Sequence, residues 1–278
     1  MPDKPDTAFT HSHEVRDDGS IAFSCSSDTD RWPWLTLDPH HPVLVQTINF
    51  WASIETAHTR GTIDPNKWSA LTEMEWTCGP PGGGRPVRGV TAKPDDDNSL
   101  DYGLSFFDAD DALVHRMTGT GVVFQTRDFE AWRDKTRSKL GIPPTSEDFQ
   151  FAAAEAVDVA SRDWSFLSPL IGEEPLSVNG LITEANGFPP SHPYLRGSGD
   201  HVNSTHLVEA GRQFASLISS GRQLRITGGD MRFTRYVELG YPFRIQSVDK
   251  SKCGISMEIF QAEKLCTAIT LRLDELNP

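Results

Sequence analysis

Glu209 and Gln213 are the two residues of this sequence best placed to do chemistry, because they interrupt an otherwise apolar helical stretch. They lie four residues apart, so a helix carries them on one face. A carboxylate on an apolar face must be hydrogen-bonded, change its pKa or take part in chemistry. His201 lies just ahead of the same stretch, and Asp200 is placed to orient it. An acid with a nearby histidine suits proton transfer, so we predict Glu209, Gln213 and His201 as catalytic residues.

The stretch Asp200–Gly221 is predicted to be a short polar entry followed by this helix. Either Asn203 or Ser204 can act as the N-cap that accepts from the first free amides. Gly221 suits a left-handed C-terminal cap. The apolar residues that recur at helical spacing are Leu207, Ala210, Phe214, Leu217 and Ile218. Because the first amides of a helix are unpaired and carry partial positive charge, we expect Asp200, Asn203 and Ser204 to border a substrate site.

Composition disfavours several classes of function. The chain has 278 residues and a formal net charge of −13, which argues against nucleic acid and anionic membranes as main partners. No apolar run approaches the roughly 20 residues of a membrane span, and the N-terminus has no signal-peptide core. The 4 cysteines form no CxxC pair, which is typical of reduced thiols in the cytoplasm. We expect no metal and no other cofactor. GPPGGG at Gly79–Gly84 is predicted to be a flexible hairpin loop, because it lacks the Lys-Ser/Thr ending of a phosphate loop.

Turn-forming clusters and linkers divide the chain into four parts. Residues 1–18 are polar and are predicted to be a flexible arm. Residues 19–127 are predicted to be the first folded half, and residues 151–278 the second. Between them, residues 128–150 are predicted to be a connecting helix, Asp128–Leu140, followed by a loop.

Each half is predicted to have one long apolar helix followed by four strand-like runs. In the first half the helix covers Val43–Thr59, and the runs are WSALTEMEWTC, RPVRGVTA, LDYGLSFFDA and ALVHRMTGTGVVFQT. In the second half a strand is predicted at DWSFLSPL, and the runs after the helix are QLRITGGDMRFTRYV, YPFRIQSVDK, CGISMEIFQA and KLCTAITLRL. The two helices align when His41 is placed on His201 or on Asn203. A repeat of this order predicts a duplicated α+β domain.

Several motifs resemble those of a known family. DHVNSTHLVEAGRQ, at Asp200–Gln213, resembles the DHVPGM-xLLEAARQ signature of the A-factor biosynthesis (AfsA-type) hotdog family. FTRYVELGYPFRI, at Phe233–Ile245, resembles its F-x-R-(F/Y)-x-E-L-x-x-P strand, and His192–Leu195 matches its His-Pro-aromatic run. In the first half, HHPVLVQTINFWASIETAH at His40–His58 is similar to its HHDPLLLAETLRQAGLLLAH segment. The resemblance covers most of the chain.

This resemblance implies a fold and an activity. The hotdog fold is a long central helix wrapped by a curved antiparallel sheet, and two copies make an α+β tandem (double) hotdog. Enzymes of the family are thought to transfer a β-ketoacyl group from acyl carrier protein to dihydroxyacetone phosphate, on the way to butenolides and γ-butyrolactones. The implied partner is therefore an acyl carrier protein or a CoA thioester, and the sequence leaves a homodimer open.

The chain departs from the family pattern at two places. Asn203, Ser204 and Thr205 replace the family's Pro-Gly-Met, which alters the backbone where a thioester carbonyl would meet the helix N-terminus. The first half also has no acid at the positions equivalent to Glu209 and Gln213. At the two alignments these positions hold Thr47 and Trp51, or Asn49 and Ser53. We therefore expect a single competent site, built around Glu209.

The chemistry expected of such a site follows from its parts. The helix N-terminus polarises a thioester carbonyl, and Glu209, with its pKa raised by apolar neighbours, acts as general base. Hotdog dehydratases pair such an acid with a histidine, for which His201 and His41 are the candidates. Arg212 and Arg235 are predicted to bind a phosphate or phosphopantetheine group, because Arg makes bidentate contacts to phosphate.

Three functions remain open at this stage. The first is AfsA-like acyl transfer, and the second is a β-hydroxyacyl dehydratase, isomerase or cyclase of a polyketide pathway. Against the second, the dehydratase pattern His-x3-Gly-x4-Pro is absent at both His41 and His201. The third is a non-catalytic hotdog that binds an acyl chain, in which Glu209 is a structural carboxylate paired with an arginine.

Overall fold

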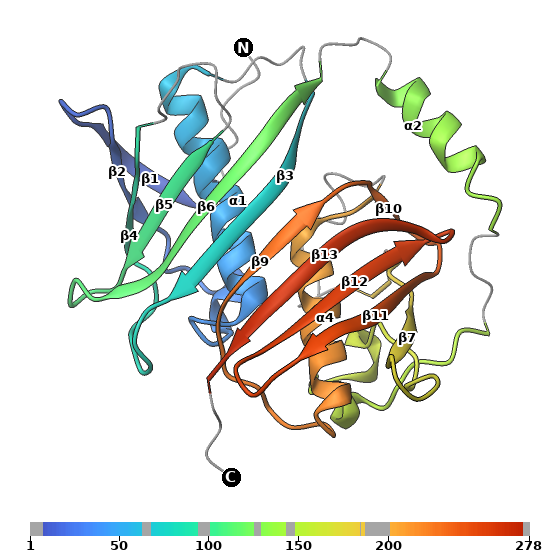
Figure 1. Ribbon diagram of the computed structural model, residues 1–278. Helices are drawn as coiled ribbons and strands as arrows, with labels where there is room; N and C mark the ends of the chain where they lie inside the picture. The colour runs from blue at the N-terminus through green and yellow to red at the C-terminus, as the bar shows by residue number, and fades with distance from the viewer. Residues whose placement is uncertain are drawn as a thin grey trace. The chain divides into compact units, whose positions relative to one another are not determined.

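The computed structural model describes residues 8–62, 68–93, 101–124, 129–142, 148–183, 185–186 and 201–274. The chain divides into two compact units, Met1–Arg127 and Asp128–Pro278. In each unit a long helix lies against one face of an antiparallel sheet (Figure 1). No described helix is long and apolar enough to cross a membrane.

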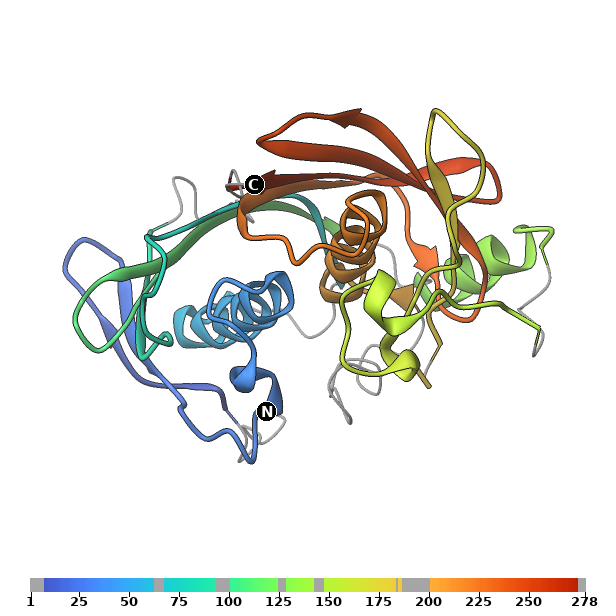
Figure 2. The same cartoon turned by 90° about the horizontal axis from the view of Figure 1, so that it is seen from below.

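The six strands of the first unit follow the order β1-β2-β4-β5-β6-β3 in their sheet, and every neighbouring pair is antiparallel. The sheet curves around helix α1 (Figure 2). The elements are β1 Thr10–Val15, β2 Ile21–Cys25, the 3-10 turn η1 Pro33–Thr36, α1 Pro42–Arg60, β3 Trp68–Cys78, β4 Arg88–Thr91, β5 Tyr102–Phe107 and β6 Leu113–Phe124. The helix and the four strand-like runs after it were all predicted.

Local signals account for the bounds of α1. Nδ1 of His41, the N-cap, accepts from the backbone N–H of Val43 at 3.2 Å, and Pro42 opens the helix, where the missing N–H costs nothing. Gly61 ends the helix in the left-handed conformation, with φ of 70°.

The predicted flexible arm is partly a strand. Phe9 is fully buried and packs against the rings of Trp32 and Trp34, with centroids 5.7 and 5.0 Å away. The next residues form β1, which pairs with β2. Sequence alone did not predict this strand, because THSHEV has only one buried residue, Thr10, and no apolar alternation.

Five strands of the second unit follow the order β9-β13-β12-β11-β7 in their sheet, and β8 and β10 form a two-stranded sheet. All the pairs are antiparallel. The elements are α2 Phe129–Ser138, the 3-10 turns η2 Ala154–Ala156 and η3 Arg162–Trp164, β7 Ser177–Gly180, β8 His201–Val202, α4 Ser204–Ile218, β9 Ile226–Phe233, β10 Val237–Glu238, β11 Phe243–Lys250, β12 Gly254–Gln261 and β13 Lys264–Leu273.

Helix α4 packs closely on this sheet. Strand β12 alternates buried and half-buried side chains along its length, so one face is turned to the core. A Cβ at Gly211 of α4 would lie 3.2 Å from Sδ of Met257 and 3.4 Å from Cδ1 of Ile269. Glycine therefore lets the helix backbone approach β12 and β13.

The strand predicted at DWSFLSPL does not form. The segment instead holds η3, followed by isolated bridges from Leu167 to Gly180 and from Ile171 to Ser177. The N–H of Phe166 donates to the side chain of Gln213 rather than to a strand, and Pro169 has no N–H to donate. The edge strand of this sheet is β7, which was not predicted.

The two units have the same strand order around their helices. In each, the first strand after the helix lies next to the last strand: β3 beside β6 in the first unit and β9 beside β13 in the second. The two middle strands, β4 and β5 or β11 and β12, then follow in the same order. An edge strand that precedes the helix pairs next, as β2 with β4 and as β7 with β11.

Candidate functional site

Glu209 lies in the second turn of α4, and only 1% of it is exposed. The helix begins as predicted: the side chain of Asn203 is the N-cap and accepts from the N–H of His206 at 3.2 Å. The ring nitrogen Nδ1 of His206 lies 2.8 Å from the same oxygen. Ser204 is the first residue of the helix. At the other end, the N–H of Gly221 donates to the carbonyl of Ser216 at 2.9 Å, and the φ of Gly221 is 73°.

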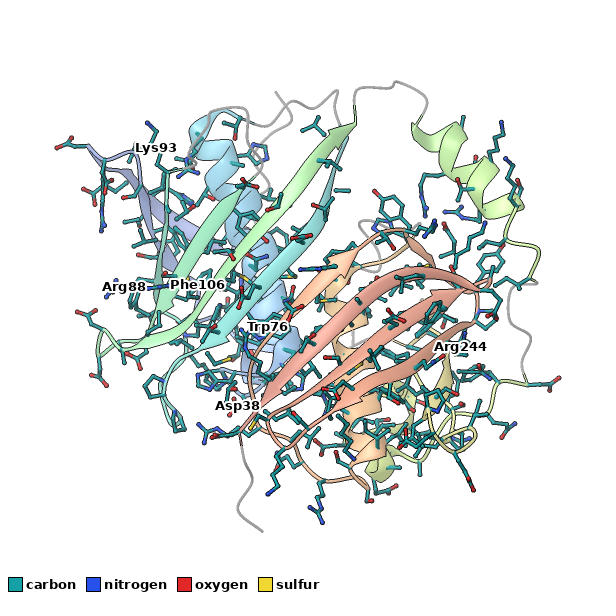
Figure 3. All side chains as sticks on the ribbon, in the orientation of Figure 1. Asp38, Trp76, Arg88, Lys93, Phe106 and Arg244 are labelled. Atoms are coloured by element: carbon teal, nitrogen blue, oxygen red, sulfur yellow. The ribbon has the colours of Figure 1, made fainter. Side chains whose placement is uncertain are left out.

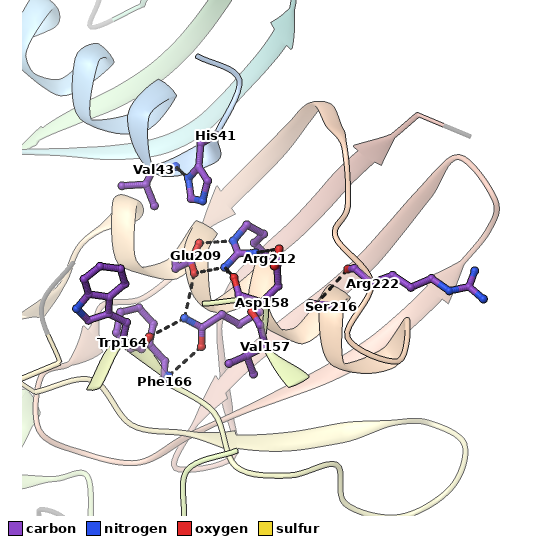
Figure 4. Close-up of polar contacts among 11 residues, drawn as sticks. His41, Val43, Val157, Asp158, Trp164, Phe166, Glu209, Arg212, Ser216 and Arg222 are labelled. Atoms are coloured by element: carbon purple, nitrogen blue, oxygen red, sulfur yellow. Dashed lines mark hydrogen bonds and ion pairs between the residues drawn. The ribbon is translucent and has the colours of Figure 1, made fainter. Parts of the chain in front are cut away.

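The Glu209 carboxylate forms a bidentate ion pair with Arg212, three residues further along α4 (Figure 4). Nε of Arg212 donates to Oε2 at 2.6 Å, and Nη2 donates to Oε1 at 2.7 Å. Both side chains are buried, with exposed fractions of 1% for Glu209 and 8% for Arg212. The geometry fixes the plane of the carboxylate, because the guanidinium is planar and holds both oxygens.

Arg212 also ties α4 to the loop that follows η2. Its Nη1 donates to Oδ2 of Asp158 at 3.0 Å, and its Nη2 donates to the backbone carbonyl of Asp158 at 2.9 Å. Asp158 has a φ of 53°, which is uncommon for a residue with a side chain. Burial by itself lowers the pKa of Arg212, but Glu209 and Asp158 outweigh burial and raise that pKa.

Gln213 joins the carboxylate to the segment after η3. Its Nε2 donates to Oε1 of Glu209 at 3.0 Å and to the carbonyl of Trp164 at 2.8 Å. Its Oε1 accepts from the N–H of Phe166 at 2.9 Å. The amide of Gln213 thus has both donors and its acceptor engaged, and Glu209 is held from two directions.

The structure brings together three of the predicted site residues, Glu209, Arg212 and Gln213. The other candidates are placed elsewhere. His201 is in β8, opposite Glu238 of β10, and its ring lies 4.6 Å from that of Tyr236. His41 is the N-cap of α1 in the first unit. Arg235 donates to the backbone carbonyl of Leu265 at 2.8 Å in an exposed position.

Asp200 and the His192–Leu195 run lie outside the described residues. Among the described residues, no three His, Cys, Asp or Glu side chains are grouped so that they could hold a metal ion.

A second buried ion pair in this unit was not predicted. Arg133 of α2 donates from Nη1 and Nη2 to the two oxygens of Glu238, at 2.6 and 2.7 Å. The two side chains are 3% and 2% exposed, and the guanidinium of Arg133 stacks over the ring of Tyr236. The bidentate pair attaches the connecting helix to β10. The only sequence signal was that Glu238 belongs to the motif at Phe233–Ile245.

The first unit also contains a buried carboxylate that was not predicted. Glu55 of α1 accepts from the N–H of Phe9 at 2.7 Å and from that of Thr10 at 2.6 Å. The Thr10 hydroxyl donates to the same carboxylate. Glu55 was missed because the two alignments of α1 with α4 place it on Ala215 or Leu217, and not on Glu209 or Gln213. Its contacts give it a structural role in holding the start of β1.

Comparison with known proteins gives the fold. No protein-family model and no curated protein sequence matches this chain. An acyl-ACP thioesterase from Bacteroides thetaiotaomicron is 12% identical, with a TM-score of 0.54, over 92% of this chain and 97% of that chain. The 12:0-ACP thioesterase from Umbellularia californica is 11% identical, with a TM-score of 0.51, over 92% and 96%. The dehydratase domain from the CurJ module of curacin polyketide synthase is 12% identical, with a TM-score of 0.51, over 96% and 98%.

The protein has a hotdog fold. In this hotdog, Glu209 lies on the helix that the sheet of the second unit covers. A buried carboxylate fixed in orientation can accept a proton from a substrate bound beside it. The same carboxylate, fully paired, can also be a structural link between α4 and the loops at residues 157–158 and 164–166.

Proposed function

We propose that this protein is an enzyme that processes acyl thioesters and that Glu209 is its general base. The observation that carries the proposal is the fixed, 1% exposed carboxylate of Glu209 on the central helix of a hotdog unit. Arg212 and Gln213 hold its two oxygens, so the carboxylate does not need to reorganise during the reaction. Solved structures with this fold include acyl-ACP thioesterases and a polyketide synthase dehydratase domain.

The reaction we propose is transfer of a β-ketoacyl group from acyl carrier protein, or from CoA, to a hydroxyl of a dihydroxyacetone-phosphate-like acceptor. Glu209 removes the hydroxyl proton, the oxygen attacks the thioester carbonyl, and the thiol leaves with a proton. The helix N-terminus at Asn203 supplies partial positive charge for the carbonyl oxygen. The motif at Asp200–Gln213 supports this reaction through its family resemblance.

The assignment of the cations is part of the same proposal. Arg212 is the residue that orients Glu209, and its guanidinium N–H groups are engaged by Glu209 and Asp158. Arg235 is exposed and keeps donors beyond the one bound to Leu265, so it is the better candidate for a phosphate. His201 is the candidate second acid–base group.

We further propose that the two units are copies of one hotdog, in a tandem arrangement. The shared strand order around α1 and α4 supports a duplication. The first copy then keeps the helix and uses its buried carboxylate, Glu55, to hold β1 rather than for chemistry.

Specific observations support two other functions. A dehydratase, isomerase or cyclase needs a base and no phosphate site, and a dehydratase domain is among the similar folds. A non-catalytic acyl-binding protein would explain why Arg212 pairs with both oxygens of Glu209.

One experiment separates these functions. A β-ketoacyl and a β-hydroxyacyl thioester, on acyl carrier protein and on CoA, are incubated with the protein with and without dihydroxyacetone phosphate, and products are identified by mass spectrometry. Thioester loss that requires the phosphate supports acyl transfer, whereas loss of water alone supports dehydration. The Glu209→Gln variant is expected to lose about 10² to 10⁴ in turnover rate. Full activity in this variant would remove Glu209 from the mechanism.

A further inference from the structure

The guanidinium of Arg212 is bound along two of its edges by two different residues (Figure 4). Glu209 occupies the edge formed by Nε and Nη2, and Asp158 occupies the edge formed by Nη1 and Nη2. At the second edge, Nη1 donates to Oδ2 of Asp158 at 3.0 Å, and Nη2 donates to the backbone carbonyl of Asp158 at 2.9 Å. Because the guanidinium is planar and rigid, a residue that fixes one edge also fixes the direction of the other. Asp158 is therefore coupled to Glu209 through Arg212.

The backbone of Asp158 is held in a conformation that suits this contact. Its φ of 53° lies in the left-handed region, which aspartate, asparagine and glycine adopt more readily than other residues do. From this conformation Asp158 presents its carbonyl and its carboxylate to one guanidinium. The carbonyl of Val157, whose side chain is fully buried, accepts from Nη2 as well, at 3.4 Å. The loop that follows η2 is thus shaped around the end of the Arg212 side chain.

The orientation of the Glu209 carboxylate depends on this guanidinium. Oε1 of Glu209 accepts from Nη2 of Arg212 at 2.7 Å and from Nε2 of Gln213 at 3.0 Å, whereas Oε2 accepts from Nε of Arg212 at 2.6 Å. If the guanidinium turned away, the bond from Gln213 would still reach one oxygen, but a single bond does not fix the plane of a carboxylate. A fixed plane therefore requires that Arg212 itself is held.

Charge favours the same arrangement. Desolvation by burial lowers the pKa of Arg212, but Glu209 and Asp158 together raise that pKa above its ordinary value. A buried guanidinium is stable only when its charge is compensated. Glu209 supplies this compensation at Nε, and Asp158, whose side chain is 35% exposed, supplies it at Nη1.

We propose that Asp158 is a positioning residue for Glu209, because it holds the Arg212 guanidinium in the direction that keeps both carboxylate oxygens in place. The role rests on the proposed function, in which Glu209 is the general base. Asp158 acts through Arg212 and does not bind the substrate. A carboxylate that rotates reaches its reactive orientation less often, so loss of Asp158 lowers the turnover rate and leaves substrate binding unchanged.

The Asp158→Gly variant tests the proposal, because glycine adopts the positive φ without strain and keeps the backbone carbonyl. NMR measures the exchange of the Arg212 Nε–H with solvent, which is expected to be roughly tenfold faster or more, the value of one hydrogen bond to a charged group. The turnover rate with an acyl thioester is expected to fall roughly tenfold, and KM to change by less than about twofold. Asp158→Asn, which keeps the shape and an acceptor oxygen, is expected to recover most of both losses.

Asp111 provides the matched control. It has a φ of 64° and accepts from Nε and Nη2 of Arg88, which is labelled on the first unit in Figure 3. This ion pair is exposed, with 38% of the Arg88 side chain and 76% of the Asp111 side chain accessible to solvent. Asp111→Gly therefore removes an aspartate–arginine pair at a positive φ away from Glu209, and it is expected to leave both the Arg212 exchange rate and the turnover rate unchanged.

Three results would overturn the proposal. The first is unchanged exchange of the Arg212 Nε–H in Asp158→Gly, and the second is an equal loss of turnover in Asp111→Gly. The third is a rise in KM at constant turnover rate, which would place Asp158 against the substrate. If the wild-type protein turns over no acyl thioester, the proposed function fails, and the exchange rates still decide whether Asp158 holds the pair of Arg212 and Glu209. Thermal unfolding checks that each variant is folded, and Asp158→Asn replaces Asp158→Gly if the latter is not.

Discussion

Arg212, one turn further along α4, donates hydrogen bonds to both carboxylate oxygens of Glu209, at 2.6 and 2.7 Å. Both side chains are almost inaccessible to solvent. The pair decides how Glu209 can act. A carboxylate in this position is oriented and charge-compensated, and it belongs to a network that includes Asp158 and Gln213. Loss of either partner leaves a buried charge.

Removal of the Arg212 guanidinium should therefore destabilise the folded protein. Arg212→Met is expected to lower the free energy of unfolding by about 3–5 kcal/mol, because Glu209 is left buried and unpaired. The double variant Glu209→Gln/Arg212→Met should lose less than the two single variants added together. Denaturant unfolding measures all three. Arg225→Met is the matched control, since its ion pair with Asp274 is exposed, and it should cost about 1 kcal/mol or less. If Arg212→Met and Arg225→Met lose the same free energy of unfolding, the buried Glu209–Arg212 ion pair does not have the structural role described.

Glu55 is expected to hold the first strand in place. Glu55→Ala removes the acceptor of the Phe9 and Thr10 amides, so it should cost about 2–4 kcal/mol and expose β1. Hydrogen exchange should rise at Phe9 and Thr10 before it rises in β5. Glu14→Ala, at an exposed position of β1, should leave the exchange unchanged. Continued protection of Thr10 in Glu55→Ala would show that Phe9 and its tryptophan neighbours suffice.

His115 should make the protein less stable in mild acid. Its pKa falls from the usual 6.5 to about 3 in the folded protein, because burial disfavours the charged ring. Between these values the unfolded chain binds a proton that the folded protein does not. Stability from this residue is therefore present above pH 6.5 and is lost as the pH falls, by about 1.4 kcal/mol per pH unit.

His115→Phe should flatten this pH dependence between pH 6.5 and pH 5, as measured by the unfolding midpoint in denaturant. His11→Gln changes an exposed histidine and should leave the dependence as in the wild-type protein. A wild-type slope in His115→Phe would mean that other residues cause the acid sensitivity.

Local structure in the two units was largely predictable from sequence. The Asn203 cap, the end of α4 near Gly221 and the strand Trp68–Cys78 follow from short-range signals, namely a polar cap, a left-handed glycine and alternation of side chains. The repeated order of helix and strands was visible for the same reason. The strand expected at DWSFLSPL does not form, because the Phe166 N–H donates to the side chain of Gln213, which is far along the chain.

The candidate site was likewise predictable only where its residues are close together in the sequence. Sequence alone determined that Glu209 and Gln213 share a face of an apolar helix, because helical periodicity is a property of neighbouring residues. Only the tertiary structure decided that Arg212 turns to Glu209 and is anchored by Asp158, and that Glu55 binds the amides of Phe9 and Thr10. The contacts with Asp158, Phe9 and Thr10 join residues 45 to 54 positions apart, and no local pattern encodes which distant backbone will approach a buried charge.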